Sequence, residues 1–495
     1  MVSSRPMTRR QLLIGGITAA NLGAFAQEPS RETVALKLAR IVHEIDFSGL
    51  PPAAIKHAKI ILASTLASAA AGRNMDSVRI VRELAKEKAG KRSASIWFDN
   101  ARLPIGEAAR ANAVASDAAA SDDSDLRTVA HIGTSVTAVG LAVAEPAAVS
   151  GPELLSAIVA GYEAAGRIGE AIVSSSDSNG SSGAINGTVG RGFHSSATVA
   201  FGGTVTAGKL LRLSPEQLAN ALGITATTVG GLAISSNSAA REYQAGNAAI
   251  TAVNAVLAAG RGYAVNPDMI EARGGFLNVF AGGTPDSKSL TREIAGGDYE
   301  ISRYLAIKLV PGAHALHCAV EAAVNAAKAM PGPPEDVAKI LVAGPQSELA
   351  SSRGAPKSVA EAIHSLPYYL ASAVADRGFS WANADPKMFG RPALTRLMGL
   401  VDKDPDPTPI RYEWNWSARV TIVTKSGEKY SSTVQAPRGS APRGIEWEDI
   451  DAKYHALTPQ SGLPPSRLDQ ALKLIHSFEG VKDVAVFARL LSKGA

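Results

Sequence analysis

A run of acids and hydroxyls, SDDSD at residues 121–125, is the densest polar cluster of the chain, and His131 follows it by six residues. A carboxylate beside a histidine can act as a general base or orient the imidazole for proton transfer. The run follows an Ala-rich helical pattern, and acids at a helix C-terminus are unfavourable unless a cation compensates them. The alternative is a solvated loop between two helices.

Three more positions offer a histidine or a cation. His194 ends a Gly-, Ser- and Asn-rich loop at 175–192 and precedes a helical pattern, where backbone N–H groups favour an anion. Arg241 lies at the start of another helical pattern, and Lys308 lies in a strand-like run. The structural alternatives are a helix-capping histidine, a solvated arginine and an exposed strand lysine.

His314 and His317 are three residues apart, which is the spacing of half a metal site. No third ligand follows at a recognisable spacing, so we predict no metal. The chain has one cysteine, which excludes a disulfide framework and a Cys-based zinc site. His364 and Tyr368 add a histidine and a phenol just before a helical pattern. This mixture of groups suits a polyanionic substrate held in a cleft between domains.

The elements that must position these groups change character along the chain. Helical patterns dominate from about residue 30 to 280, with capping-box spacing at Ser150 and Ser214 and a further helix start at 266–268. β-rich runs follow at 304–310, 338–342, 419–423 and 430–434, with helical patterns at 319–329 and 368–375 between them. Helical patterns return at 447–454 and 465–491. The sequence predicts a mainly α protein with an α+β insert.

The N-terminus reads as a targeting segment. Paired arginines, Arg9 and Arg10, precede an apolar run to Ala26, which ends in the small-x-small pattern AFA. This resembles a twin-arginine secretion signal and predicts a periplasmic or secreted protein, or a cytoplasmic one if the signal is not used. The run is too short to span a bilayer, which needs about 20 apolar residues. No later uncharged segment is long enough either.

Composition excludes other classes. The chain of 495 residues is 46% hydrophobic and 19% charged, a globular balance. Its net charge is +5, and three of those charges lie in the first 26 residues, which leaves +2 without them. The basic excess is therefore not a patch on the folded body, and we predict no nucleic-acid partner.

Several segments together carry a family resemblance. They lie in one order along the chain, from about residue 31 to 490: AN at 111–112, SDD at 121–123, HIG at 131–133, RGFH at 191–194, AGNAA at 245–249, EARGGF at 271–276, IK at 307–308 and SLPY at 365–368. The chain resembles the MmgE/PrpD family, which includes 2-methylcitrate dehydratase, cis-aconitate decarboxylase and iminodisuccinate epimerase. Each motif is modest, but the ordered set is specific for the family.

The resemblance implies a helical domain built from both ends of the chain and a smaller α+β lid domain. The expected ranges are 1–26 for the signal, 30–290 and 445–495 for the helical domain, and 291–444 for the lid. It also implies a homodimer and catalysis without a metal or organic cofactor. The expected substrate is a small di- or tricarboxylate, and the reaction moves a proton next to a carboxylate.

Site residues are carried over position by position. Matches to family motifs imply catalytic roles for His131, Lys308 and Tyr368, with an acid from Asp117 or Asp122. The same matches imply substrate contacts from the following residues: Asp123, Ser124, His194, Arg241 and His317.

Three positions depart from the family pattern. Ala120 occupies the place of the first acid of the D-F-D-D motif, and Asp117 replaces a histidine three residues earlier. Arg241 stands where a lysine is usual, and a guanidinium grips carboxylates but does not give up a proton near neutral pH. We expect Asp117 or Asp122 to stand in for the missing acid.

Our hypothesis is therefore a lyase of the dehydratase or decarboxylase type. The alternatives are an epimerase or isomerase of a dicarboxylate, an exported carboxylate-binding protein that has lost chemistry at Ala120, and a metalloenzyme that uses His314 and His317.

Overall fold

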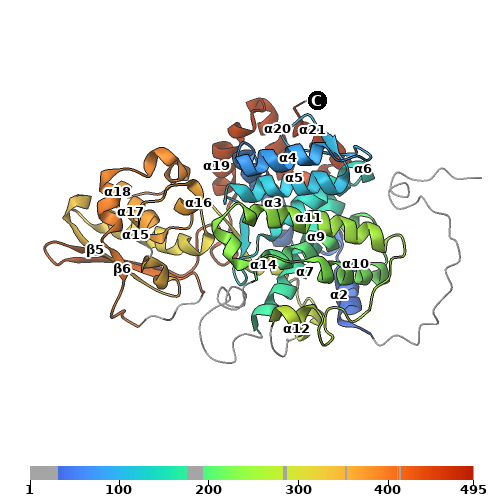
Figure 1. The fold of residues 1–495 in the computed structure, drawn as a ribbon, viewed down its shortest axis with the longest axis horizontal. Helices are drawn as coiled ribbons and strands as arrows, with labels where there is room; N and C mark the ends of the chain where they lie inside the picture. The colour runs from blue at the N-terminus through green and yellow to red at the C-terminus, as the bar shows by residue number, and fades with distance from the viewer. Residues whose placement is uncertain are drawn as a thin grey trace, which may run out of the picture.

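Two units of unequal size, a large helical unit and a small α+β unit, make up the computed structural model (Figure 1). The structure describes residues 32–174, 193–281, 287–351, 354–409, 411 and 414–493. The predicted signal at 1–26 and the loop at 175–192 lie outside these residues. None of the helices in the described ranges combines the length and apolar character that a bilayer span requires.

Helices rich in alanine and glycine build most of the large unit. Its helices before the small unit are α2 (Val34–His43), α3 (Pro52–Gly72), α4 (Asp76–Lys86), α5 (Ile105–Ala118), α6 (Ile132–Ala147), α7 (Gly151–Ser174), α9 (Ser196–Leu210), α10 (Pro215–Thr228), α11 (Ala240–Ala259), α12 (Phe276–Ala281), α13 (Lys288–Thr291) and α14 (Glu300–Tyr304). A two-stranded ribbon of β1 (Ala94–Ser95) and β2 (Arg102–Leu103) lies among them.

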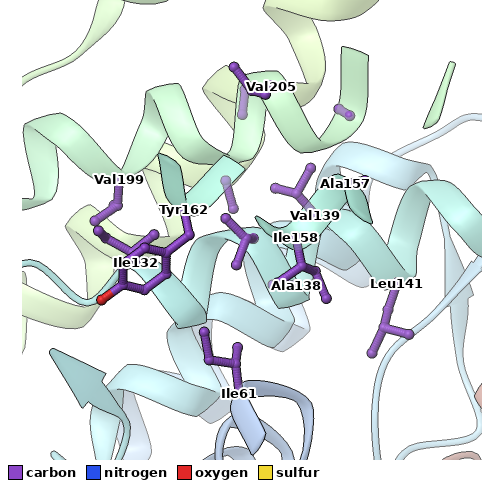
Figure 2. Close-up of a cluster of buried hydrophobic side chains, with 14 of the residues drawn as sticks. Ile61, Ile132, Ala138, Val139, Leu141, Ala157, Ile158, Tyr162, Val199 and Val205 are labelled. Atoms are coloured by element: carbon purple, nitrogen blue, oxygen red, sulfur yellow. The ribbon is translucent and has the colours of Figure 1, made fainter. Parts of the chain in front are cut away.

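Small residues let these helices approach closely. A Cβ on Gly161 of α7 would lie 2.2 Å from Thr206 Oγ1 and 2.6 Å from the Gly202 carbonyl oxygen, both on α9. Figure 2 shows the core where α6, α7 and α9 meet, with Ile132 and Tyr162 among the labelled side chains. The site histidine, His131, directly precedes Ile132, so this core fixes its backbone.

The end of the chain returns to the large unit. Helices α19 (Trp447–Leu457), α20 (Pro465–His476) and α21 (Val484–Leu490) pack against α3 and α6, and they lie on the large unit in Figure 1. Their apolar side chains belong to the same core as those of α2 and α3.

The small unit is an α+β layer with its own core. Its sheet has the strand order β6-β5-β7-β8, in which β5 and β6 are parallel and the other pairs are antiparallel. The strands are β5 (Val337–Ala343), β6 (Val401–Lys403), β7 (Ala418–Thr424) and β8 (Lys429–Val434), and the helices are α15 (His317–Ala329), α16 (Val359–Ala362), α17 (Leu366–Asp376) and α18 (Pro392–Met398). Helix α15 packs on β7 and β8. The fold is mainly α with an α+β insert, as predicted.

A second short ribbon joins the two units. Strand β3 (Asp123–Asp125) pairs antiparallel with β4 (Leu305–Ile307), so that Asp123 lies opposite Ile307. Side chains alternate along a strand: Leu305 and Ile307 enter the core of the large unit, whereas Ala306 enters the core of the small unit. The ribbon thus places the acid run and Lys308 at the boundary between the units.

Most local predictions are confirmed, and one is wrong. Ser214 forms the predicted capping box with Gln217, and Ser150 donates to Glu153 just before α7. The helix predicted to start at 266–268 is instead a series of turns. Gly274 there has φ of +79°, and α12 begins only at Phe276.

Candidate active site

A cavity of about 760 Å³ opens where the two units meet. Its lining includes His131, His194 and Arg241 of the large unit, with Lys308 beside His131. Segments between residues 312 and 365 line it as well, and their titratable side chains include His314, Lys357, Glu361 and His364.

His131 lies at the centre of a charged cluster. It caps the N-terminus of α6, and its Nδ1 is 2.5 Å from Asp117 Oδ1 and 2.8 Å from Asp122 Oδ2. On the other edge of the ring, Nε2 is 3.3 Å from Lys308 Nζ. Because carboxylates only accept hydrogen bonds, they hold a proton on Nδ1 and leave Nε2 as the exchanging nitrogen.

The charges in this cluster shift one another's pKa values. Burial lowers the pKa of His131, but Asp122 and Asp117 outweigh both burial and Lys308 and raise it to about 9. Burial works against ionisation of Asp122, yet His131 and Lys308 hold its pKa well below the usual range. In the same way, Arg241 and His131 overcome burial and lower the pKa of Asp117. Two carboxylates and an imidazolium are therefore the stable forms at neutral pH.

The β3–β4 ribbon sets the distance between Lys308 and Asp122. The Lys308 backbone N–H donates to the Asp122 carbonyl at 3.1 Å, and Lys308 Nζ donates to Asp122 Oδ1 at 2.6 Å. Thr134 Oγ1, one turn into α6, donates to Asp122 Oδ2 at 3.1 Å. Lys308 is only 1% exposed, so its ammonium has little water to compete with these partners.

Arg241 is held mainly by Asp117. Its Nε donates to Asp117 Oδ2 at 3.0 Å, and its Nη2 donates to the carbonyls of Asp117 at 2.8 Å and Ala118 at 3.2 Å. The guanidinium also borders the cavity. Its contact with substrate stays a prediction, but its hydrogen bonds show that it orients the acid that contacts His131.

Asp117 contacts the same imidazole nitrogen as Asp122 although it lies on a different element, the last turn of α5. Ala120, between them, is fully buried and has φ of +46°. A second carboxylate therefore reaches His131 without an acid at position 120.

Asp123 and Ser124 lie behind the cavity wall. Asp123 Oδ2 accepts from the Gly133 N–H at 2.8 Å, and burial together with Asp122 raises its pKa to about 6. A Cβ at Gly133 would lie 2.6 Å from Asp123 Oδ1, so the close approach requires glycine. Ser124 is buried and pairs with Ala306 in the ribbon. Neither side chain is among the described residues that line the cavity.

Tyr368 and His317 also lie away from the cavity lining. Tyr368 is buried in the core of the small unit, where its hydroxyl donates to the Asn383 carbonyl at 2.9 Å. The structure thus does not bring Tyr368 to His131, and we assign it no step. His317 lies behind His314, with ring centroids 4.5 Å apart, and burial lowers its pKa to about 3.

His194, for which we predict a substrate contact, borders the cavity. Burial and the charge of His131 lower its pKa to about 4, so it is a neutral imidazole at neutral pH. His314 and His364 border the cavity as well. In the sequence, His314 stands out only by its spacing to His317, and His364 only by its place before a predicted helix.

The buried Lys453 was missed entirely. It lies on α19 and donates to Ser64 Oγ at 2.7 Å and to the Ser121 carbonyl, next to Asp122. In the sequence it is the single lysine of a C-terminal helical pattern, and no local pattern marks it as buried.

Asp117, Asp122 and His131 are the described residues that come nearest to a metal site, with ligand atoms within 4.8 Å of one another. Lys308 and Arg241 already bind these carboxylates and would repel a divalent cation. The donor set therefore fits an acid–base cluster better than a metal centre.

Comparisons with known proteins identify the family of the chain. The MmgE/PrpD N-terminal domain profile matches residues 36–288, and the C-terminal domain profile matches residues 311–475. The chain is 22% identical to cis-aconitate decarboxylase of Homo sapiens over 472 residues, which is 93% of this chain and 95% of that protein. The corresponding Mus musculus enzyme is 23% identical over 474 residues, 93% of each chain. The Aspergillus terreus enzyme is 31% identical over 183 residues, covering 36% of this chain and 35% of that protein.

Proposed function

The chain belongs to the MmgE/PrpD family, and we propose that it is a cofactor-independent lyase that acts on a small di- or tricarboxylate by moving a proton at the carbon next to a carboxylate. The observation that carries the proposal is the His131 cluster at the cavity. It combines an imidazole that exchanges a proton at Nε2 with an ammonium 3.3 Å from that nitrogen.

The cluster can perform both halves of such a reaction. As an imidazolium, His131 gives a proton from Nε2 to the substrate carbon, and only in its neutral form does it take one. Asp117 and Asp122 hold the opposite edge of the ring in both cases. The Lys308 ammonium stabilises the enolate-like charge that develops when a C–H bond or a C–CO₂ bond breaks. In a decarboxylation the electron pair left by CO₂ is protonated by His131. In a dehydration the neutral His131 takes the proton from carbon at Nε2, a C=C bond forms as the C–O bond breaks, and the same proton passes from Nε2 to the hydroxide, which leaves as water.

Cavity size and relatives support the substrate class. A volume of about 760 Å³ lies within the range of small-molecule sites, and the named relatives act on cis-aconitate, a tricarboxylate. His194 and His314 border the cavity as neutral imidazoles, each of which carries one N–H. Such donors orient a carboxylate without adding charge.

We would test the proposal by NMR, incubating the purified protein with a panel of di- and tricarboxylates in D₂O. Net loss of water or CO₂ from one acid, absent in His131→Asn, supports the lyase. Deuterium exchange at carbon with a change of configuration but no net loss identifies the epimerase alternative. Arg303→Ala, which removes an exposed charge paired with Asp298, serves as the control.

The binding-protein alternative rests on Ala120, the family acid position that holds no acid here. It predicts that a citrate-like acid raises the melting temperature of the protein while no carbon exchanges deuterium. Ala120→Asp would then restore hydration or decarboxylation. An aspartate tolerates the positive φ at this position better than most residues do.

The homodimer and the export of the protein are also proposals. Light scattering of the purified protein tests the first. Fusing residues 1–26 to a reporter that folds before export, with Arg9→Lys and Arg10→Lys together as the control, tests the second.

A further inference from the structure

Lys453 is a buried lysine whose hydrogen bonds go to uncharged oxygens. Its ammonium donates to Ser64 Oγ on α3 and to the Ser121 carbonyl, and the Trp381 ring centroid lies 5.9 Å away. It forms no ion pair within the described part of the chain, and the residue is only 2% exposed. A lysine is rarely this buried without a paired acid, because desolvating an ammonium is costly.

The position of Lys453 indicates what the costly burial of its ammonium achieves. Ser121 is the residue before Asp122, so Lys453 ties the start of the acid run to α19 and α3. Burial lowers the pKa of Lys453 to about 7, although Asp122 and Asp123 favour its ammonium form; Lys308 opposes that form. The ammonium is therefore the dominant form below neutral pH. Lys453 therefore lies behind the carboxylates, whereas Lys308 binds Asp122 directly.

We propose that Lys453 is a positioning residue that holds the Ser121 carbonyl and thereby fixes Asp122 and Asp123 against His131 and the start of α6. Lys453 is not among the described residues that line the cavity. It acts through the backbone, by keeping the Asp122 carboxylate on His131 Nδ1, and through its charge, which favours the ionised form of both acids. The expected effect on kcat rests on the proposed function. The expected effect on the placement of the Asp122 carboxylate does not.

The test compares Lys453→Met with Lys209→Met. Lys209 is a matched control because its ammonium likewise donates to two uncharged oxygens, the carbonyls of Val42 and His43, but from the last turn of α9. We expect Lys453→Met to lower kcat by at least about tenfold, the effect of losing a charged hydrogen bond. The acidic limb of its pH–rate profile moves to higher pH, because Asp122 and Asp123 lose a cation that favours their ionised form.

A second readout needs no substrate. The His131 Nδ1–H, bound between two carboxylates, gives a low-field proton resonance that is assigned by its loss in His131→Asn. We expect this resonance to persist in Lys209→Met and to shift or broaden in Lys453→Met. This measurement stands even if no carboxylic acid proves to be a substrate, so it separates failure of the positioning role from failure of the proposed function.

Either of two results would overturn the proposal. One is an unchanged resonance in Lys453→Met together with kcat within about twofold of wild type and an unmoved acidic limb. The other is the same loss in Lys209→Met, which would indicate general destabilisation. If Lys453→Met does not fold, Lys453→Gln replaces it: the amide keeps a donor for the Ser121 carbonyl but no charge, and the acidic limb is still expected to move.

Discussion

Two clusters of buried charge in the large unit invite comparison. One is the site cluster of His131, Asp117, Asp122, Lys308 and Arg241. The other, which we name the arginine–glutamate cluster, lies beside α7 and α14 and contains Arg127, Glu163, Arg167, Glu170, Arg292 and Glu300. Both bury several charges of each sign.

The clusters differ in whether they present a titrating group to the cavity. In the arginine–glutamate cluster Arg167 donates to Glu163 Oε1 at 2.7 Å and to the Leu290 carbonyl at 3.3 Å, and Arg127 stacks on the Tyr304 ring. None of its members borders the cavity within the described ranges. The site cluster instead contains an imidazole that titrates and borders the cavity. Buried charge alone thus holds elements together, and chemistry needs an exchangeable proton at an opening.

The largest expected effect is a loss of activity on substitution in the site cluster. Lys308→Met removes the ammonium that faces His131 Nε2, and we expect kcat/KM to fall by about 10²–10⁴-fold. Circular dichroism should show that the fold is retained. Activity near that of wild type would mean that the site cluster is structural, like its counterpart.

The next prediction concerns the arginine–glutamate cluster, where we expect a loss of stability without a loss of activity. Arg167→Met leaves Glu163 buried without its partner, and we expect the free energy of unfolding to fall by about 3–5 kcal/mol. The kcat of the folded protein should stay within about twofold of wild type, measured well below the melting temperature. Chemical denaturation measures the first quantity, and Arg303→Ala, an exposed pair, should cost at most about 1 kcal/mol. A strong loss of kcat in Arg167→Met would erase the distinction.

The pH dependence of stability should single out the site cluster. The pKa of His131 is raised to about 9 in the folded protein, so its stabilising contribution is complete below about pH 6.5 and is lost as pH rises through about 9. We therefore expect wild type to melt at a higher temperature than His131→Asn at pH 6, and this difference to shrink by pH 10. Titrating groups that His131 does not perturb, Lys453 included, are common to both proteins and cancel. A difference that is constant with pH would contradict the raised pKa.

A smaller effect is expected from Thr134→Val. It removes the hydroxyl that donates to Asp122 Oδ2 while keeping the shape of the side chain. Asp122 keeps Lys308 and His131 as partners, so we expect kcat to fall by less than about tenfold. A loss as large as that of Lys308→Met would give Thr134 a direct role in the reaction.

No effect is expected from chelation. The side chains of Arg241 and Lys308 already bind Asp117 and Asp122, so treatment with EDTA should leave activity unchanged. Elemental analysis of the purified protein provides the independent measurement. Loss of activity that zinc or another divalent ion restores would support the metalloenzyme alternative.

The fold class could be predicted because helix periodicity and capping are local signals. A proline pair marks the start of α3 in the sequence, and capping-box spacing marks the start of α7. Strand β4 lies within the β-rich run predicted at 304–310. Its pairing with β3 could not be predicted, because β3 is three residues long and lies about 180 residues away in sequence. Strand β6 was missed for the same reason of length.

Site residues divide in a similar way. Family motifs named His131, Asp122 and Lys308, and the structure brings these three together. The same motifs named Tyr368, whose side chain points into the core of the small unit because α17 packs against α15 and α18. Lys453 has no motif at all, since only the packing of α19 on α3 buries it.

The β3–β4 ribbon has one more consequence. Lys308 precedes the sheet of the small unit in sequence, yet its backbone is hydrogen-bonded to the strand that carries the acids. Lys308, the acids Asp117 and Asp122, and His131 are therefore all fixed to the helices of the large unit. If the rest of the small unit swings, the entrance to the cavity widens or narrows while the reacting groups keep their alignment.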